Sequence, residues 1–415
     1  FGLGVTVGDL NNDGWDDIYV SNDFFEKDYL YINQRDGTFK EVSDDALGHM
    51  SYASMGSDMI DFNNDGWLDI FTTDMLPETD ERLKTTTKFD NYNPQDAKLK
   101  NDFHHQFASN CLQLNNGDGT FSEIADLAGV EATDWSWGAL SFDFNNDGWK
   151  DLFVSNGISK DLTDQDFLDF FSSDEAMRQV RSGGFNFRSF LDKMSSTPIP
   201  NYGFINQKNL KFQNQSMELG LATPGFSNGA AYGDLDDDGD LDLVVNNENM
   251  EAFVYRNMAS EKLHTSYLKV ELKGNAPNTF GFGARVTVFS NGIMQILEQM
   301  PSRGFESSVE PVLNFGLGNA KKIDSLIVRW PDLKTQKLSN IRTDTMLVLV
   351  QKDATGYYKQ PSSPPALFEN ITSSVISGNI VHKENDFIDF NAEPLIPKML
   401  STEGPKMAVG DVNGD

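Results

Sequence analysis

Hydrophobic residues occur along most of the chain in short runs that alternate with polar residues. The run DIYVSND at 17–23 returns as DIFTTD at 69–74, DLFVSN at 151–156 and DLVVNN at 242–247. Runs of this length, rich in β-branched and aromatic residues and bounded by turn residues, predict β-strands. A shorter strand-like run precedes them, such as VTVG at 5–8, so the sequence predicts a series of β-hairpins.

A second pair of strand-like runs follows three of these hairpins, at 30–48, 112–130 and 203–221. Two hairpins make a four-stranded unit, and the first unit repeats after 52 residues, from Asp9 to Asp61. Four-stranded units of about 40–50 residues are typical of β-propeller blades.

The later repeats are longer because of two predicted insertions, at 75–108 and 157–200. The second contains a helical pattern with Phe167, Leu168 and Phe171 on one face. Long insertions on a rigid β scaffold are where binding residues tend to lie, so both are candidate contact regions for a partner.

An aspartate-rich loop joins the two strands of each first hairpin. The complete copies are DLNNDGWDD at 9–17, DFNNDGWLD at 61–69, DFNNDGWKD at 143–151 and DLDDDGDLD at 234–242, called loops 1 to 4 below. Position 6 is always glycine and position 9 is always aspartate. The candidate ligands at positions 1, 3, 5, 7 and 9 are Asp9, Asn11, Asp13, Trp15 and Asp17; Asp61, Asn63, Asp65, Trp67 and Asp69; Asp143, Asn145, Asp147, Trp149 and Asp151; and Asp234, Asp236, Asp238, Asp240 and Asp242. A fifth, truncated copy offers Asp411, Asn413 and Asp415.

This pattern predicts calcium sites. Calcium takes six to eight oxygen ligands from carboxylates, amides, backbone carbonyls and water, position 7 could offer its backbone carbonyl, and glycine allows the sharp turn. An EF-hand would need glutamate at position 12, where this chain has valine or threonine. A plain Asn-Asp-Gly turn is the simpler alternative, but turn chemistry does not require an aspartate at position 9. We therefore expect four complete Ca²⁺ sites and a truncated fifth, with calcium in a structural role.

The segments before the loops point to a family. FGLGVTVGDL, SMGSDMIDF, WSWGALSFDF and FSNGAAYGDL resemble FG-GAP or VCBS repeats, the calcium-loop blades of integrin-alpha-like propellers. The resemblance covers residues 1–258. The tryptophans at position 7 could be sugar-stacking platforms, but packing between blades explains their recurrence better.

Residues 259–353, the β module below, carry no aspartate loop but show alternating strand patterns such as YLKVELKG and GARVTVFSNG. The motifs RGF at 303–305, FGLG at 315–318 and VRWP at 328–331 resemble the ASPIC/UnbV domain, which follows such repeats in cartilage acidic proteins and bacterial surface proteins. Arg303 and Arg329 could bind an anionic partner, but pairing with acidic neighbours is the better explanation. The glycine pairs at 281–283 and 316–318 open no helix and make poor phosphate loops.

After a linker at 354–365, residues 366–415 resemble the start of further propeller repeats, as in large VCBS-repeat surface proteins of Bacteroidota. The expected fold class is all-β: calcium-loop propeller blades, a small β-sandwich-like ASPIC/UnbV domain and short helical insertions. The chain starts without methionine and ends within a motif, so we expect a fragment or a processed chain.

Charge limits the possible partners. The net charge of −30 disfavours nucleic acid and suits cations. Hydrophobic residues make up 39 %, enough for a packed core, and no apolar run is long enough to cross a membrane. The single cysteine, Cys111, can form no internal disulfide and is expected to be a small buried hydrophobe.

No catalytic motif stands out. His104 and His105 with Asp102, or His382 with Glu384 and Asp386, could form acid–base or metal clusters, but surface loops explain both better. The sequence therefore predicts a non-catalytic, extracellular or cell-surface scaffold, secreted or a lipoprotein. It would be associated with a bacterial outer membrane and would recognise other surface proteins, an outer-membrane transporter complex or glycans. A carbohydrate-active lyase or hydrolase on a calcium-stabilised propeller is the alternative.

Overall fold

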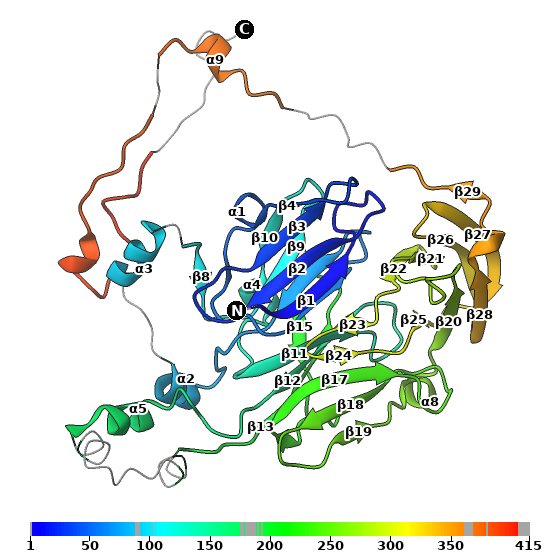
Figure 1. Cartoon of the computed structure of the whole chain (residues 1–415), viewed down its shortest axis with the longest axis horizontal. Helices are drawn as coiled ribbons and strands as arrows, with labels where there is room; N and C mark the ends of the chain where they lie inside the picture. The colour runs from blue at the N-terminus through cyan, green and yellow to red at the C-terminus, as the bar shows by residue number, and fades with distance from the viewer. Residues whose placement is uncertain are drawn as a thin grey trace. The chain divides into compact units, whose positions relative to one another are not determined.

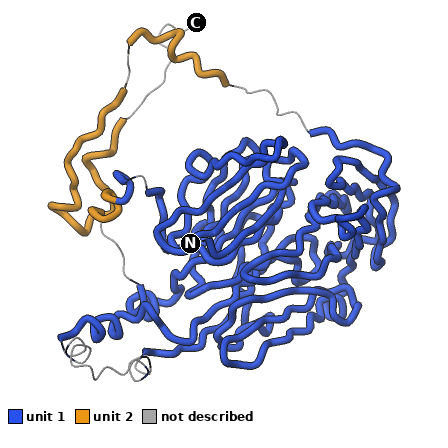
Figure 2. Tube along the Cα trace, viewed as in Figure 1, with its two compact units in different colours: residues 1–89, 98–360 blue, residues 90–97, 361–415 orange. Residues whose placement is uncertain are grey.

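The computed structural model of the chain describes residues 2–87, 92–101, 103–174, 178, 188, 191, 194–360, 368–378 and 381–405. Its contacts divide it into two units (Figure 2). The first contains residues 1–89 and 98–360, and the second contains residues 90–97 and 361–415. The propeller blades and the β module both lie in the first unit.

Four antiparallel sheets follow one another along the chain and are called blades 1 to 4 (Figure 1). Blades 1 to 3 each have the four predicted strands, whereas blade 4 has three, because the chain after β19 enters α8 (Ala259–Leu263) and the β module. Blade 1 contains β1 (Gly2–Gly8), β2 (Asp17–Asn22), β3 (Tyr29–Asn33) and β4 (Phe39–Glu41); blade 2 contains β6 (Ser57–Ile60), β7 (Asp69–Thr72), β9 (Cys111–Asn115) and β10 (Phe121–Glu123); blade 3 contains β11 (Ser136–Phe142), β12 (Asp151–Asn156), β14 (Tyr202–Asn206) and β15 (Phe212–Asn214); blade 4 contains β17 (Ser227–Gly233), β18 (Asp242–Asn247) and β19 (Phe253–Tyr255).

Neighbouring blades touch through their first strands, since β1 contacts β6, β6 contacts β11 and β11 contacts β17. Apolar side chains fill the space between blades. Tyr19 and Leu30 of blade 1 belong to one buried cluster with Met59 and Ile70 of blade 2. This packing of consecutive sheets face to face, each contributing its buried side chains, is the expected core of a propeller.

The β module consists of two sheets, with strand orders β25-β20-β28 and β22-β21-β26-β27-β29. It extends beyond the expected boundary at residue 353, because β29 in the predicted linker pairs with β27. Their bounds are β20 (Ser266–Lys273), β21 (Arg285–Ser290), β22 (Ile293–Glu298), β25 (Val312–Gly318), β26 (Lys322–Arg329), β27 (Lys334–Arg342), β28 (Thr345–Val350) and β29 (Gly356–Tyr357). Trp330 and Phe315 are fully buried in it. The all-β fold class predicted from the sequence is confirmed.

A small hairpin of the β module, β23 (Ser302–Arg303) with β24 (Ser307–Ser308), lies against the first strands of the blades (Figure 1). β23 contacts β1, β24 contacts β17, and Gly304 forms a β-bridge with Ser57 at the start of β6. The hairpin therefore ties the β module to the inner edge of several blades.

The insertions and connections carry the remaining elements. These are α1 (Ser43–Ala46), β5 (Met50–Ser51), α2 (Asp80–Thr86), α3 (Tyr92–Leu99), β8 (Gln106–Phe107), α4 (Ala125–Ala128), α5 (Gln165–Ser172), β13 (Ile199–Pro200), β16 (Pro224–Gly225), η1 (Gln351–Asp353), α9 (Thr372–Val375) and η2 (Asp389–Asn391). α5 is the helix predicted in the second insertion, and the Asp164 side chain caps it by accepting from the Phe167 N–H at 2.9 Å. Among the described helices, none combines the length and apolar character needed to cross a membrane.

Asp28 is a buried carboxyl group in blade 1 with a testable pH dependence. It accepts hydrogen bonds from the Tyr19 hydroxyl (2.5 Å) and the Ser54 hydroxyl (2.7 Å), but burial outweighs them and raises its pKa to about 7. In the unfolded chain its pKa is about 3.9. The stabilisation that this proton provides is complete below pH ~4 and is lost as the pH rises through about 7.

We expect Asp28→Asn to reduce the loss of stability between pH 5 and 8, measured by urea unfolding at fixed calcium. The control variant Asp126→Asn, at an exposed position, should show the same loss of stability between pH 5 and 8 as the unchanged chain.

Candidate metal centre

The four aspartate loops share one hydrogen-bonding pattern. In loop 1 the Asp9 carboxylate accepts the N–H groups of Asp13 at 3.0 Å and Gly14 at 2.8 Å, and loops 2 to 4 repeat both bonds. The glycine at position 6 has a φ of 90° to 93° in every loop. Only glycine adopts such a backbone readily, which explains why position 6 never varies. The fifth copy, with Asp411, Asn413 and Asp415, lies outside the described residues.

The aspartate at position 9 closes each loop. In loop 1, Asp17 accepts the N–H of Leu10 at 3.0 Å through one oxygen and the N–H of Asn33 at 2.9 Å through the other. The other loops repeat this pair of bonds. The aspartate at position 9 therefore has a hydrogen-bonding role, because it connects the turn to the third strand, besides the metal ligation predicted for it.

Two sets of asparagines connect neighbouring blades, and neither set was predicted from the sequence. At position 4, the Nδ2 of Asn12 donates to the Gly66 carbonyl at 3.1 Å and that of Asn64 donates to the Gly148 carbonyl at 3.0 Å. Asn146 makes the same link to loop 4. A second set lies at or just after the end of the third strand of blades 2 to 4. Asn115, Asn206 and Asn257 each donate to the carbonyl at position 2 of the preceding loop, at 2.8 to 2.9 Å. The signal was present as the recurring asparagine in LYIN, LQLN, GFIN and VYRN.

These links predict a graded effect of removing the strand-3 asparagine. Asn206 donates to the Phe62 carbonyl of blade 2 and to the Lys150 carbonyl of its own blade, whereas Asn33 donates only within its own blade. Because a buried carbonyl that loses its partner costs about 1–3 kcal/mol, Asn206→Ala should lower the free energy of unfolding by about 2–3 kcal/mol. Asn33→Ala is the matched control and should cost clearly less. Equal costs in urea unfolding would contradict the inter-blade role.

Most of the loop carboxylates are buried, and their pKa values reflect it. Burial raises the pKa of Asp17 to about 7 and those of Asp61 and Asp143 to about 6. It also raises the pKa values of Asp69 and Asp151 well above the usual range of an aspartate. In each of these groups a neighbouring loop carboxylate adds to the shift. A divalent cation at the loop centre would offset both effects.

Loop 4 brings three carboxylates close together. One carboxylate oxygen each of Asp234, Asp236 and Asp242 lies within 4.8 Å of the others. All of the candidate metal-ligand atoms in the loops are oxygens, and calcium prefers oxygen ligands. The residues therefore fit Ca²⁺, which would supply charge neutralisation and a rigid loop.

Basic side chains contact the carboxylates of loops 1, 3 and 4. Arg35 pairs with Asp13, Lys208 with Asp147, and Arg256 with both Asp236 and Asp238. Two more come from the β module: Arg329 pairs with Asp9 at 2.5 Å and Lys269 with Asp234 at 2.7 Å. For loop 2, no described lysine or arginine nitrogen lies within 4.0 Å of a carboxylate oxygen. Loop 2 is therefore the loop whose charge is least compensated by the protein itself.

The β module packs on all four loops. At the position-6 glycine of every loop, an added side-chain carbon would meet a residue of the β module. These residues are Leu333 for loop 1, Met294 for loop 2, Gln295 for loop 3 and Tyr267 for loop 4. Gly316, considered above as part of a phosphate loop, instead approaches loop 3 so closely that a side-chain carbon there would meet Asp143 and Asn146. The module thus covers the loops directly.

The two arginines of the family motifs pair with acidic residues, as expected. Arg303 Nη1 lies 2.6 Å from the Asp58 carboxylate, and Arg329 contacts both Asp9 and Glu298. Asp58 and Asp9 belong to the blades, so these ion pairs join the two parts of the unit.

Trp15 and Trp67 at position 7 have different surroundings, and the expected packing between blades stays a prediction. Trp15 is 41 % exposed, and Trp67 lies against Gly117 in a turn of its own blade. Loop 4 has Asp240 at this position, whose carboxylate is fully buried and accepts from Asn146 at 2.7 Å. The residue at position 7 is therefore set by its immediate surroundings in each blade.

The histidines weighed as acid–base candidates show no catalytic arrangement in the part of the chain that is described. His104 lies 4.0 Å from Asp44, and burial lowers its pKa. His105 is exposed, and Asp102 lies outside the described residues. His382 pairs with Glu384 at 3.1 Å in an exposed segment of the second unit.

Comparison with protein families agrees with this geometry. The FG-GAP-like repeat model matches residues 9–72 and 105–154, which contain loops 1 to 3. The model for ASPIC and UnbV matches residues 274–356, most of the β module. The chain contains FG-GAP-like repeats and an ASPIC/UnbV domain. The interface described above is therefore one between FG-GAP-like blades and the ASPIC/UnbV domain.

Two curated relatives are cartilage acidic proteins. Cartilage acidic protein 1 of Xenopus tropicalis is 25 % identical over 343 residues, which cover 80 % of this chain and 42 % of that protein. The human protein of the same name is 26 % identical over 255 residues, 54 % of this chain and 37 % of that protein. The match spans only about two-fifths of the length of these relatives. The repeats and these relatives indicate a repeat protein of the extracellular type.

Solved structures show only distant likeness. An Agrocybe aegerita lectin described for its recognition of non-reducing terminal N-acetylglucosamine has a TM-score of 0.28 at 15 % identity, covering 81 % of this chain and 80 % of its own. The pore of the Photorhabdus luminescens Tc holotoxin has a TM-score of 0.25 at 14 % identity, covering 82 % of this chain and 11 % of its own. TM-scores this low support no inference about the ligand.

Proposed function

We propose that this chain is a calcium-binding, non-catalytic scaffold of an extracellular protein. In this proposal each aspartate loop holds one structural Ca²⁺, and the ASPIC/UnbV domain holds the loop-bearing face of the blades together. The observation that carries the proposal is the four-fold repetition of one carboxylate arrangement, with the same hydrogen bonds in every loop.

Electrostatics supports a cation at these loops. Asp61 and Asp69 of loop 2 are almost completely buried, and the pKa values of both are raised by burial and by neighbouring carboxylates. Burying several carboxylates without a counter-charge is costly, whereas a bound cation turns the same groups into ligands. At an extracellular calcium concentration near 10⁻³ M, loops with a Kd of about 10⁻⁴–10⁻³ M would be occupied.

The location and partners rest on resemblance. The cartilage acidic protein relatives support an extracellular location, and the similarity to Bacteroidota surface proteins supports association with an outer membrane. We propose that the recognition partners are other surface proteins, contacted through the insertions at 75–108 and 157–200. In the described part of these insertions, α2 contacts α5. Arg82 of the first insertion pairs with Asp161 of the second insertion and with Asp134, which lies just before β11 of blade 3.

Direct calcium titration tests the proposal. We expect isothermal titration calorimetry of the chain to report four bound Ca²⁺ ions. Asp65→Asn in loop 2 should remove one of them, because Asp65 is an exposed position-5 ligand whose loss leaves the fold intact. Asp118→Asn, an exposed turn carboxylate of the same blade, is the matched control and should retain all four. Absence of binding, or an unchanged stoichiometry in Asp65→Asn, would contradict the proposal.

A further inference from the structure

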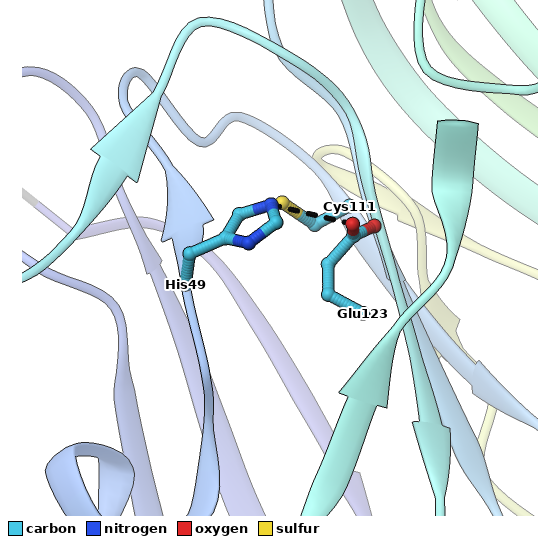
Figure 3. Close-up of side chains that lie close together, drawn as sticks. All are labelled: His49, Cys111 and Glu123. Carbon is cyan, nitrogen blue, oxygen red and sulfur yellow. Dashed lines mark ion pairs between the residues drawn. The ribbon is translucent and has the colours of Figure 1, made fainter. Parts of the chain in front are cut away.

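A second cluster of metal-binding side chains lies in blade 2, away from the aspartate loops. His49 directly precedes β5, Cys111 begins β9 and Glu123 ends β10. One ligand atom of each lies within 4.8 Å of the other two. Figure 3 shows the His49 ring turned toward the Cys111 sulfur and the Glu123 carboxylate. His49 Nε2 is 3.3 Å from Glu123 Oε2.

Glu123 is fixed so that one carboxylate oxygen faces this cluster. Its Oε1 accepts the N–H groups of Ala125 at 2.7 Å and Leu112 at 3.0 Å, which leaves Oε2 for His49. Burial opposes ionisation of Glu123, but the hydrogen bonds from His49 and from the two backbone N–H groups lower its pKa overall. The side chain therefore presents a negatively charged oxygen to the cluster.

His49 is also positioned. Its backbone carbonyl accepts from Gln113 Nε2 at 2.8 Å, and its ring packs edge-on against Phe107 with 5.3 Å between ring centroids. About a third of the side chain is exposed, so the cluster is open to solvent on this side.

The repeats show which of these residues have a general role and which are special to blade 2. Glu41 of blade 1 accepts a hydrogen bond from the N–H of Ser43 at 2.7 Å, and Glu123 of blade 2 accepts the equivalent bond from the N–H of Ala125. A glutamate at this position is therefore a general feature of these two repeats. Cys111 pairs with the fourth residue of the second strand of its blade. The residues that make the equivalent pair are Tyr29 in blade 1 and Tyr202 in blade 3. In blade 1 the basic partner of Glu41 is Lys27. Only blade 2 therefore combines a thiol, an imidazole and a carboxylate at this place among the described blades.

We propose that His49, Cys111 and Glu123 bind one zinc-type divalent cation, with a water molecule as the fourth ligand. Zinc takes sulfur, imidazole and carboxylate ligands in tetrahedral sites, at about 2.3 Å for sulfur and 2.0–2.2 Å for nitrogen and oxygen. Calcium prefers oxygen ligands, so this site and the aspartate loops select different ions. The three ligand atoms already lie within 4.8 Å of one another, so the cation would draw them closer when it binds.

Binding requires the thiolate. Burial and the nearby carboxylates of Glu123 and Asp74 raise the pKa of the Cys111 thiol, so without a cation it stays protonated and unreactive. When the cation binds, the sulfur–metal bond forms, the S–H bond breaks, and the proton leaves to solvent. Cys111, expected from the sequence to be only a small buried hydrophobe, would then be a ligand.

Cobalt provides a direct test, because a thiolate bound to Co²⁺ gives a charge-transfer absorption band in the near ultraviolet. Cys111 is the only cysteine of the chain, so any such band must come from this site. The whole chain would be titrated with Co²⁺ in millimolar calcium, which keeps the aspartate loops occupied. We expect the band to appear at one cobalt per chain and to disappear when Zn²⁺ is added.

Two variants separate the site from the fold. His49→Gln changes a part-exposed side chain and should weaken cobalt binding at least about 100-fold, because it removes a direct ligand. His105→Gln replaces a nearby exposed histidine and should leave binding unchanged. Absence of a thiolate band in the folded chain, or an unchanged affinity in His49→Gln, would overturn the proposal. Neither result would bear on the calcium loops, whose ligands contain no sulfur.

Discussion

Replacement of Arg303 by methionine should destabilise the folded chain by about 3–5 kcal/mol, the usual cost of removing one partner from a buried ion pair. Arg303 Nη1 lies 2.6 Å from Asp58 Oδ1 and 3.1 Å from the Met59 carbonyl, and both charged side chains are buried. The second oxygen of Asp58 accepts the Ser141 N–H at 2.9 Å. The variant would leave a buried carboxylate without a cation at the junction of blade 2, blade 3 and the β module.

Urea unfolding in saturating calcium measures this effect, and Arg342→Met is the matched control. Arg342 is exposed on β27, so the same loss of charge should change stability by less than about 0.5 kcal/mol. Adding Asp58→Asn to Arg303→Met should restore part of the loss, because the double variant buries no unpaired charge. A loss below about 1 kcal/mol for Arg303→Met would show that the hairpin does not hold the module to the blades.

Removal of calcium is the second large effect that we expect. A ligand that binds only the folded state stabilises that state by RT ln(1 + L/Kd), where L is the free ligand concentration. This is about 1.4 kcal/mol per site for a loop with a Kd of about 10⁻⁴ M at about 10⁻³ M calcium. The loss should extend beyond the loops, because Asn12 and Asn64 connect each loop to the next and the ASPIC/UnbV domain packs on all of them. Unfolding in chelator should therefore involve the blades and the domain together.

The sequence was sufficient to predict the fold class, and it placed the candidate calcium ligands in one repeated loop; calcium binding itself stays a prediction. Strand runs bounded by turn residues and a fixed glycine at position 6 are local signals, and local backbone conformation decides both. Local signals could not predict that blade 4 has only three strands. The absence of a fourth strand depends on the path of the chain after Tyr255, which enters α8 and the β module.

Contacts between repeats could not be predicted in the same way. The role of Asn206 depends on the Phe62 carbonyl, 144 positions earlier in the chain, and that of Arg303 on Asp58. Such pairs become visible only when the blades are placed next to one another. The recurring tryptophan at position 7 is another example, because Trp15 is 41 % exposed whereas Trp67 lies against Gly117.

The proposed cation site at Cys111 likewise depends on contacts between residues that are distant in the sequence. Its burial was predicted correctly from its apolar neighbours Leu112 and Leu114. Its proximity to His49 and Glu123 was not, because these residues come from three different strands or loops. A comparison of equivalent positions in the blades was needed to show that only blade 2 has this combination.

Thermal unfolding of the chain in millimolar calcium and then in excess chelator tests the central claim most directly. The account predicts a large decrease in Tm in chelator that is restored by calcium and not by an equal concentration of magnesium, which is bound reluctantly by all-protein oxygen cages. An unchanged Tm would show that the aspartate loops are turns held by their backbone hydrogen bonds alone, and it would contradict the calcium-stabilised scaffold proposed here.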